Sequence, residues 1–221
     1  MKRIIQIIII TSILFVGCKK ERANRHYQKA YNLEEEDRYE EAIKELDKAI
    51  ELNPKFEQAY LDRAIDKSVL GDYKGAIKDL DIFIELEPYA IEPYVWRAEY
   101  KRMLEQYESA LEDVEKALEQ KGYTRIIQDV NTNIVGEVFY DVEREFILYE
   151  RACSNYMLGN YDILDDLNYC IHKKVMLKDC FYMRGIVYIA SDMKAEGCQD
   201  LNIAERLEAG YTNDLIEKYC N

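Results

Sequence analysis

Residues 57–90 read EQAYLDRAIDKSVLGDYKGAIKDLDIFIELEPYA, and the same pattern occurs one such length upstream and one downstream. A shift of 34 residues aligns small, aromatic and apolar positions in three copies: Ala30, Ala64 and Ala98; Tyr39, Tyr73 and Tyr107; Ala42, Ala76 and Ala110; Leu46, Leu80 and Val114; Ala49, Phe83 and Ala117. A fixed period of this length with small residues at fixed offsets is typical of stacked helix-turn-helix units.

Each repeat predicts two antiparallel helices joined by a tight turn. The turns are expected around Asp37, Gly71 and Glu105. Ala64 and Ala76 are expected where the two helices cross, because small side chains let helix axes approach to about 8 Å. The sequence therefore predicts an all-α chain.

The segments AYLDRA with GDYKGAIKDLDIFIELEP, and PYVWRA with QYESALEDVEKAL, resemble tetratricopeptide repeats (TPRs). The resemblance implies a right-handed TPR α-solenoid of about five units plus a C-terminal capping helix. Three units match closely and two match more weakly, with Leu164 and Gly185 replacing alanines at helix crossings. The expected organisation is a signal peptide at 1–17, a lipid-anchored tether at 18–22, three TPR units at 23–124, an insert at 125–144, and two degenerate units with the capping helix at 145–221.

The resemblance also implies a concave groove that binds a protein or peptide segment. Carrying over the first-helix offsets 2, 5, 9 and 12 of the family gives Asn24, Tyr27, Tyr31, Glu34, Gln58, Leu61, Ile65, Ser68, Glu92, Val95, Glu99 and Arg102, and in the weaker units Tyr149, Tyr156, Tyr182 and Ile186. Capture of a C-terminal carboxylate is not expected, because Tyr31, Ile65 and Glu99 stand where such a clamp needs asparagine.

Charges repeat along with the helices. The pairs are Lys29 with Glu45, Arg63 with Asp79, Arg97 with Asp113, Arg184 with Asp200, and Arg151 with Asp166 one position from the expected offset. The basic residues form either a ligand-binding ladder or salt bridges between the two helices of each unit, and we favour the salt bridges. Exposed pairs of this kind contribute about 0.2–1 kcal/mol each.

The N-terminus, MKRIIQIIIITSILFVGC, has two basic residues and then an apolar run of the length found in signal peptides. Its end, LFVGC, resembles the lipobox of bacterial lipoproteins, which implies that Cys18 becomes the first mature residue and carries a diacylglycerol thioether and an acylated amine such as palmitoyl amide. An uncleaved signal anchor or an ordinary secreted protein is the alternative. Because Lys19 follows the cysteine, the family analogy favours the outer membrane. The C-terminal segment is similar to those that close repeat lipoproteins of Bacteroidetes-like bacteria.

The chain is acidic, with a formal net charge of −13 that falls to −15 without residues 1–17. Such a chain repels nucleic acid at long range, so a neutral or basic protein partner is expected and nucleic acid is not. No phosphate-binding glycine loop, nucleophile elbow or paired-histidine metal motif is present, so neither catalysis nor a cofactor is predicted. Acidic runs such as residues 34–37 are interpreted as solvated charge.

The period is interrupted at residues 122–141, where β-branched residues flank Asn131-Thr132-Asn133. Arg125–Val130 and Ile134–Tyr140 form either a short hairpin or extensions of the neighbouring helices. Toward the C-terminus a helix is expected to turn at Ala209-Gly210 and a last helix to begin with Thr212 or Asn213 as its cap.

Five cysteines follow Cys18. Antiparallel helices joined at Gly210 would bring Cys198 beside Cys220, which predicts either a disulfide or two buried thiols. Cys170 with Cys180 is a weaker candidate pair. A metal site of Cys170, His172 and Cys180 is the alternative there, but its spacing matches no zinc motif.

These observations predict a non-catalytic, lipid-anchored TPR protein that binds a peptide or protein segment at the envelope. The first alternative is a structural subunit of an outer-membrane assembly complex that makes contact through its convex face or the 122–141 insert. The second is a glycan-binding accessory protein, for which Trp96 is the sole tryptophan.

Overall fold

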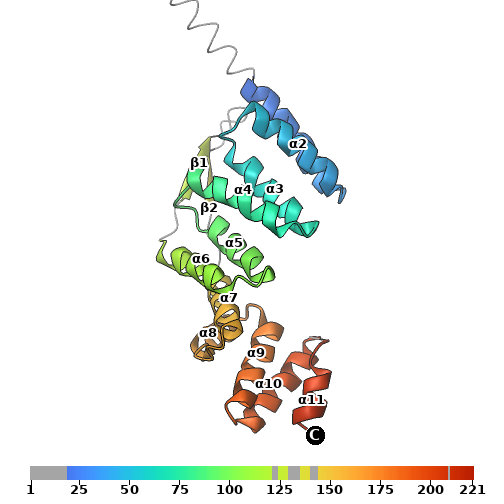
Figure 1. Cartoon of the computed structure of the whole chain (residues 1–221), viewed down its shortest axis with the longest axis vertical. Helices are drawn as coiled ribbons and strands as arrows, with labels where there is room; N and C mark the ends of the chain where they lie inside the picture. Colours follow the sequence, from blue (N-terminus) through green and yellow to red (C-terminus); the bar gives the residue numbers. More distant parts are fainter. Residues whose placement is uncertain (1–18, 121–123, 129–134, 140–143, 209) are drawn as a thin grey trace, which may run out of the picture. The chain divides into compact units, whose positions relative to one another are not determined.

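The computed structural model describes residues 19–120, 124–128, 135–139, 144–208 and 210–221. The signal peptide and Cys18 therefore lie outside the described residues. Contacts divide the chain into two compact units, unit 1 (Met1–Tyr100) and unit 2 (Lys101–Asn221). Figure 1 shows that nearly all of the described residues are helical.

Unit 1 begins with a helix at residues 19–34, so residues 19–22 of the expected tether are already helical. The following helices are α2 (Tyr39–Leu52), α3 (Glu57–Val69), α4 (Tyr73–Leu86) and α5 (Glu92–Met103), the last of which crosses the boundary between the units. Unit 2 continues with α6 (Tyr107–Glu119), α7 (Arg144–Met157), α8 (Leu164–Lys173), α9 (Leu177–Ala190), α10 (Lys194–Arg206) and α11 (Asn213–Tyr219).

The turns inside the repeats lie where the 34-residue period places them. Asp37, Gly71 and Glu105 have φ angles of 57°, 80° and 59°, in the left-handed region. In the first of these turns the amide of Arg38 donates to the carbonyl of Leu33, six residues apart counting both ends, which is the Schellman arrangement that ends a helix. The predicted turn positions are therefore confirmed.

Small residues lie at the helix crossings, as predicted. Ala64 and Ala76 are both 0% exposed. In the last repeat the equivalent positions are Gly185 and Gly197, and a Cβ atom on Gly197 would lie 2.7 Å from the carbonyl oxygen of Gly185. Because that distance is too short for any real Cβ atom, α9 and α10 cross more closely than alanine would permit.

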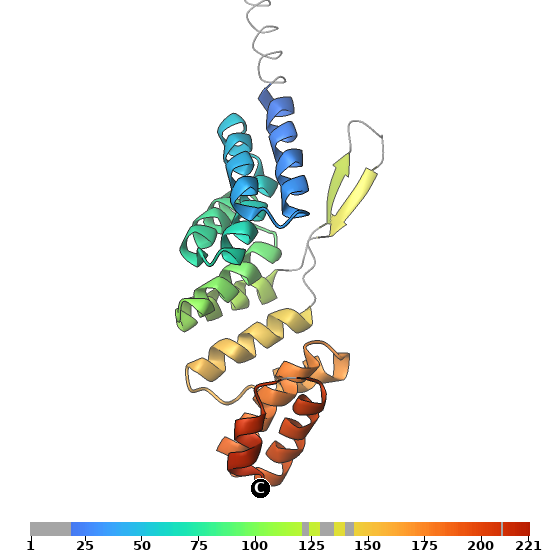
Figure 2. The same cartoon turned by 90° about the vertical axis from the view of Figure 1, so that its right-hand side faces the viewer.

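The insert contains the hairpin, which was one of the two predicted alternatives. Strands β1 (Thr124–Gln128) and β2 (Val135–Phe139) pair antiparallel, with Ile126 opposite Glu137. Figure 2 shows the two strands side by side. The predicted Asn131-Thr132-Asn133 turn lies outside the described residues.

At the C-terminal end, the turn and the start of the last helix lie where the sequence predicts them, but Thr212 does not cap the helix as expected. Gly210 has a φ angle of 65° and Thr212 occupies the N-cap position of α11. Its hydroxyl makes no capping hydrogen bond; it is buried and donates to the Glu205 carboxylate instead. The side chain therefore ties the start of α11 to α10.

Cys198 and Cys220 form a disulfide, which was one of the two predicted alternatives, with Cα atoms 5.5 Å apart. It links α10 to the residue that follows α11. Together with the Thr212 contact, it fixes both ends of the short terminal helix against α10.

Candidate functional site

A pocket of about 360 Å³ lies on unit 2 where the first helices of two repeats and the terminal helix meet. That volume lies within the range of small binding pockets, about 300–1,000 Å³. Its lining is largely aromatic and aliphatic, with Tyr156, Tyr182, Ile186, Ile189, Ala190, Leu215 and Tyr219. We call this set the aromatic pocket.

Neighbouring rings support the two tyrosines of the aromatic pocket that come from first helices. Tyr156 contacts Tyr161 edge-on with ring centroids 5.6 Å apart, and Tyr182 contacts Tyr211 edge-on at 4.7 Å. Tyr211 in turn donates a hydrogen bond to the carboxylate of Asp179 on α9. Edge-to-face aromatic contacts contribute about 0.5–1.5 kcal/mol each, so both rings are held in defined positions.

Three of the pocket residues, Tyr156, Tyr182 and Ile186, are among the groove residues that the family resemblance implies. The repeat pattern did not predict the other four lining residues of the aromatic pocket. Ile189 lies outside the carried-over offsets, and Leu215 and Tyr219 belong to α11, which is no part of the repeat. A signal for α11 existed in the cysteine spacing, since the disulfide brings this helix onto the last repeat.

The other predicted groove residues divide by their exposure. Leu61 and Val95 are 2% and 1% exposed and their side chains pack in the core. The rest are at least partly exposed: Asn24, Tyr27, Tyr31, Glu34, Gln58, Ile65, Ser68, Glu92, Glu99, Arg102 and Tyr149. Both buried residues stand at offset 5 of their repeats, where Tyr27 of the first repeat is partly exposed.

Arg102 is held by a carboxylate of its own unit. Its Nε and Nη2 atoms donate to the two oxygens of Glu150 at 3.0 and 3.3 Å. Glu150 is 2% exposed and the Arg102 side chain 22%. Burial works against the charge of Arg102, but Glu150 keeps the pKa of the guanidinium above its ordinary value. Arg102 therefore has its partner inside unit 2.

Unit 1 contains three carboxylates whose charges act on one another, Glu34, Asp62 and Asp66, which we call the carboxylate cluster. Asp66 is 2% exposed, and its Oδ2 atom has no hydrogen-bond partner. Glu34 Oε1 is likewise buried without a partner. Asp62 Oδ1 accepts from Gln58 Nε2 at 3.0 Å. The family resemblance had assigned Glu34 to the groove, although the acidic run 34–37 was interpreted as solvated charge. Neither Asp62 nor Asp66 was singled out by the sequence pattern.

The carboxylate cluster is electrostatically unfavourable when its members are ionised. Burial is the largest cause that raises the pKa of Glu34 to about 7, and the charge of Asp62 adds to it. Burial also raises the pKa of Asp66 to about 7, with added contributions from Glu34 and Asp62. Burial raises the pKa of Asp62 as well, against hydrogen bonds from Tyr27 and Gln58. The charged neighbours that shift Glu34 and Asp66 are thus all carboxylates.

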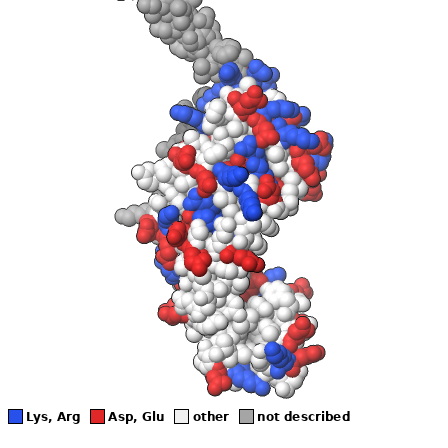
Figure 3. All heavy atoms as spheres, in the orientation of Figure 1, with Lys and Arg blue, Asp and Glu red and all other residues white. Residues whose placement is uncertain are grey.

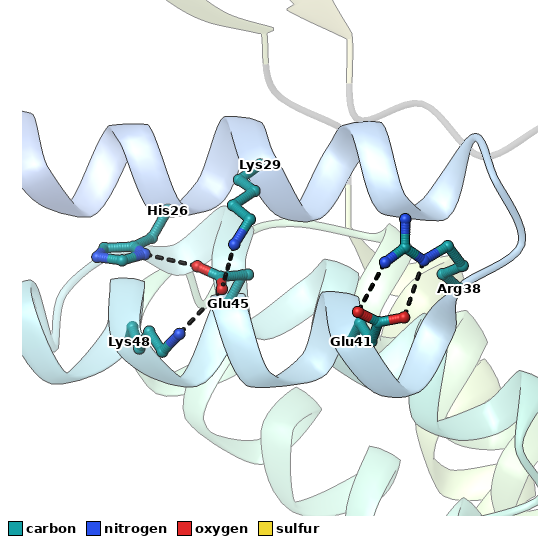
Figure 4. A network of polar contacts seen from close by, with 6 residues as sticks. All are labelled: His26, Lys29, Arg38, Glu41, Glu45 and Lys48. Carbon is teal, nitrogen blue, oxygen red and sulfur yellow. Dashed lines mark hydrogen bonds and ion pairs between the residues drawn. The ribbon is translucent and has the colours of Figure 1, made fainter.

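Four of the five predicted charge pairs are salt bridges between the two helices of one repeat. Figure 4 shows His26 and Lys29 of the first helix directed at Glu45 of α2, with Lys29 Nζ 2.8 Å and His26 Nδ1 2.6 Å from its oxygens. A hydrogen bond from Lys29 is the largest cause that lowers the pKa of Glu45 to about 2. The same contact joins Arg63 to Asp79 at 2.6 Å, Arg184 to Asp200 at 2.7 Å and Arg151 to Asp166 at 2.7 Å.

Two features of these pairs were not predicted. The acceptors are buried rather than exposed, since Glu45, Asp79 and Asp200 are 5%, 3% and 3% accessible. The arginines also reach the second helix of the preceding repeat: Arg63 Nη1 lies 2.6 Å from Asp47, Arg97 Nη1 2.6 Å from Asp81 and Arg184 Nη1 2.6 Å from Asn168. The basic side chains thus join successive repeats, which accounts for their periodicity without a ligand.

The remaining cysteines are buried thiols in the structure. Cys170 Sγ donates to the carbonyl of Glu145 at 3.1 Å and Cys180 Sγ to that of Val175 at 3.7 Å. Burial raises the pKa of the Cys153 thiol to about 12. His172 is exposed, and in the part of the chain that the structure describes no three His, Cys, Asp or Glu side chains are placed to hold a metal ion.

Comparison with known families supports the interpretation of the 34-residue units as tetratricopeptide repeats. A tetratricopeptide-repeat model matches residues 23–56, the same bounds that the 34-residue period gives for the first unit. The fold is that of tetratricopeptide-repeat proteins. No curated protein sequence matches the chain significantly.

Solved TPR structures extend the likeness over most of the chain. YrrB, described as a TPR protein with an unusual peptide-binding site, is 18% identical with a TM-score of 0.67, over 92% of this chain and 97% of that chain. MamA from Desulfovibrio magneticus RS-1 is 13% identical with a TM-score of 0.69, over 86% and 97%. The first TPR of Spaghetti (RPAP3), bound to an HSP90 peptide, is 18% identical with a TM-score of 0.50, over 63% and 95%. At these identities the likeness establishes the fold alone.

Proposed function

We propose that the protein is a non-catalytic adaptor of the bacterial cell envelope that binds a segment of a partner protein through its TPR units. The aromatic pocket is the observation that carries this proposal. It combines first-helix residues of two repeats with a terminal helix held by a disulfide, so its walls are fixed before a ligand arrives. Two of the similar solved structures, YrrB and the RPAP3 repeat, are described with peptide binding.

The lining of the aromatic pocket defines the ligand that it would accept. Its walls are apolar or aromatic and carry the Tyr hydroxyls as polar groups. On the face shown in Figure 3, charged side chains of both signs cover unit 1, whereas unit 2 presents a broad area without them. A large aliphatic or aromatic side chain of an extended segment would bury its surface in such a pocket, and aromatic anchors of this type dominate the energy of many interfaces.

Replacing Tyr182 by alanine is expected to weaken the binding of such a segment at least tenfold, or about 1.4 kcal/mol. Ligand segments would be selected from a random peptide library with the wild-type chain and measured by fluorescence anisotropy. Tyr182→Phe should retain most of the binding, because it keeps the aromatic ring that an apolar side chain of the ligand would contact. Tyr169→Ala, on an exposed tyrosine of α8, is the control. Equal affinities for wild type and Tyr182→Ala would refute the proposal.

We further propose that a lipid on Cys18 anchors the protein to the outer membrane. The basic start, the apolar run and the LFVGC sequence support this proposal. Within residues 19–120, 144–208 and 210–221, no helix is long and apolar enough to cross a membrane. Several buried acyl chains would hold the protein firmly, since each CH₂ contributes about 0.8 kcal/mol.

Cells fed an alkyne-labelled fatty acid should incorporate the label into the wild-type chain but not into Cys18→Ser. The wild type should sediment with outer-membrane vesicles, and the variant should be released with the soluble fraction. Cys153→Ser, which removes a buried thiol, should keep both the label and the membrane fraction. Labelling that persists in Cys18→Ser would exclude this residue as the lipid attachment site.

A further inference from the structure

We propose that the carboxylate cluster of unit 1 binds the positively charged side chain of a lysine or arginine in the partner segment. This proposal deepens the proposed function, since it gives the chemistry of the partner. It rests on buried oxygens rather than on acidity alone. Asp66 is 2% exposed and its Oδ2 atom has no hydrogen-bond partner, and Glu34 Oε1 is also buried without one.

Buried carboxylate oxygens without partners are unusual in proteins. An unpaired buried polar group destabilises the folded state, and an ionised one does so more strongly. The other buried acids of unit 1 are neutralised: Glu45 contacts His26, Lys29 and Lys48, and Asp79 contacts Arg63 and Lys67. His26, Lys29, Arg63 and Lys67 are thus engaged by other carboxylates, while the carboxylate cluster holds like charges together.

The three carboxylates come from two first helices, residues 19–34 and α3, next to residues that the family resemblance assigns to the groove. Glu92 of α5 is a further carboxyl beside them: burial raises its pKa, and the negative charge of Asp62 raises it further. Tyr27 and Gln58 hydrogen-bond Asp62 and hold its carboxylate in place. Sequential first helices thus present one acidic surface rather than scattered charges.

A side-chain cation fits this surface better than a metal ion does. Among the described residues no three acidic side chains are placed to hold a metal. An ammonium or guanidinium group is larger, donates several hydrogen bonds and can contact carboxylates that are several ångströms apart. The net charge of −13 would also attract a basic segment at long range.

The test compares peptide binding by variants that change charge equally. A fluorescein-labelled Gly-Ser peptide with three lysines is titrated with the full chain in detergent micelles at 150 mM salt, followed by anisotropy. A second peptide carries acetyl-lysine at the same positions. The variants are Asp66→Asn, Glu34→Gln and the control Glu51→Gln, an exposed carboxylate of α2 with the same loss of one charge. Circular dichroism confirms that each variant is folded.

The lysine peptide should bind wild type at least tenfold more tightly than the acetyl-lysine peptide does. Asp66→Asn and Glu34→Gln should each weaken the binding of the lysine peptide at least fivefold, and Glu51→Gln should weaken it less than twofold. Equal losses in all three variants would show non-specific attraction and overturn the proposal. So would binding of spermidine, sensitive to Asp66, without binding of the peptide.

Failure of this inference is separable from failure of the proposed function. Selected apolar ligands that depend on Tyr182 but show no response to Asp66→Asn would refute the basic-partner proposal and keep the adaptor. Lysine-peptide binding that depends on Asp66, with no effect of Tyr182→Ala on any ligand, would support the basic-partner proposal. It would refute the aromatic pocket as a binding site.

Discussion

Replacing Glu150 by alanine is expected to lower the free energy of unfolding by about 3–5 kcal/mol. Glu150 is 2% exposed and accepts two hydrogen bonds from the Arg102 guanidinium. Without the carboxylate, the arginine remains in a site where 22% of its side chain reaches solvent and no longer has its partner. Urea unfolding followed by circular dichroism at 222 nm measures the change.

The control is the double variant Arg102→Leu, Glu150→Leu, which removes both charges and fills the space with apolar side chains. Its free energy of unfolding should fall much less than that of Glu150→Ala, because replacing a buried ion pair by packed apolar residues often changes stability little. A loss of less than about 1 kcal/mol in Glu150→Ala would mean that solvent reaches the guanidinium freely. That result would also restore Arg102 as a side chain available to ligands.

Much of the fold follows from one period. The turns at Asp37, Gly71 and Glu105 are determined by a local rule, since a helix that ends in a Schellman arrangement needs a left-handed residue at a fixed position. The salt bridges between helices follow from two offsets that repeat. The bounds of the first unit, 23–56, agree with the matching repeat model. These features depend on neighbours close in sequence or one repeat away.

The candidate sites depend on more distant neighbours, and the sequence predicts them less well. Leu215 and Tyr219 enter the aromatic pocket because α11 folds back onto the last repeat, which the repeat pattern does not include. Asp66 occupies a helix position that the sequence alone does not mark as buried, yet it is 2% exposed in the folded chain. A sequence signal existed for the contacts between repeats, because Asp47 and Asp81 are also 34 residues apart.

The carboxylate cluster is expected to make the chain less stable as the pH rises from about 4 to about 7. The pKa of Asp66 is raised from 3.8 to about 7 by burial and by Glu34 and Asp62. Between these pH values the folded state keeps a proton that the unfolded state has lost, so the free energy of unfolding falls with rising pH. A pKa difference of that size corresponds to at most about 4 kcal/mol, and solvent relaxation should reduce it to about 2–3 kcal/mol.

Asp66→Asn should therefore raise the free energy of unfolding by about 2–3 kcal/mol at pH 8 and change it little at pH 4. The amide is isosteric and uncharged, so it removes the repulsion without leaving a cavity. Urea unfolding at pH 4, 6 and 8 measures how the free energy of unfolding of wild type and of Asp66→Asn changes with pH. Glu51→Gln is the charge-matched control. Parallel pH profiles for wild type and Asp66→Asn would show that Asp66 ionises normally. A variant that gains stability while losing the lysine peptide would indicate that the unpaired carboxylate is retained for binding, at the expense of stability.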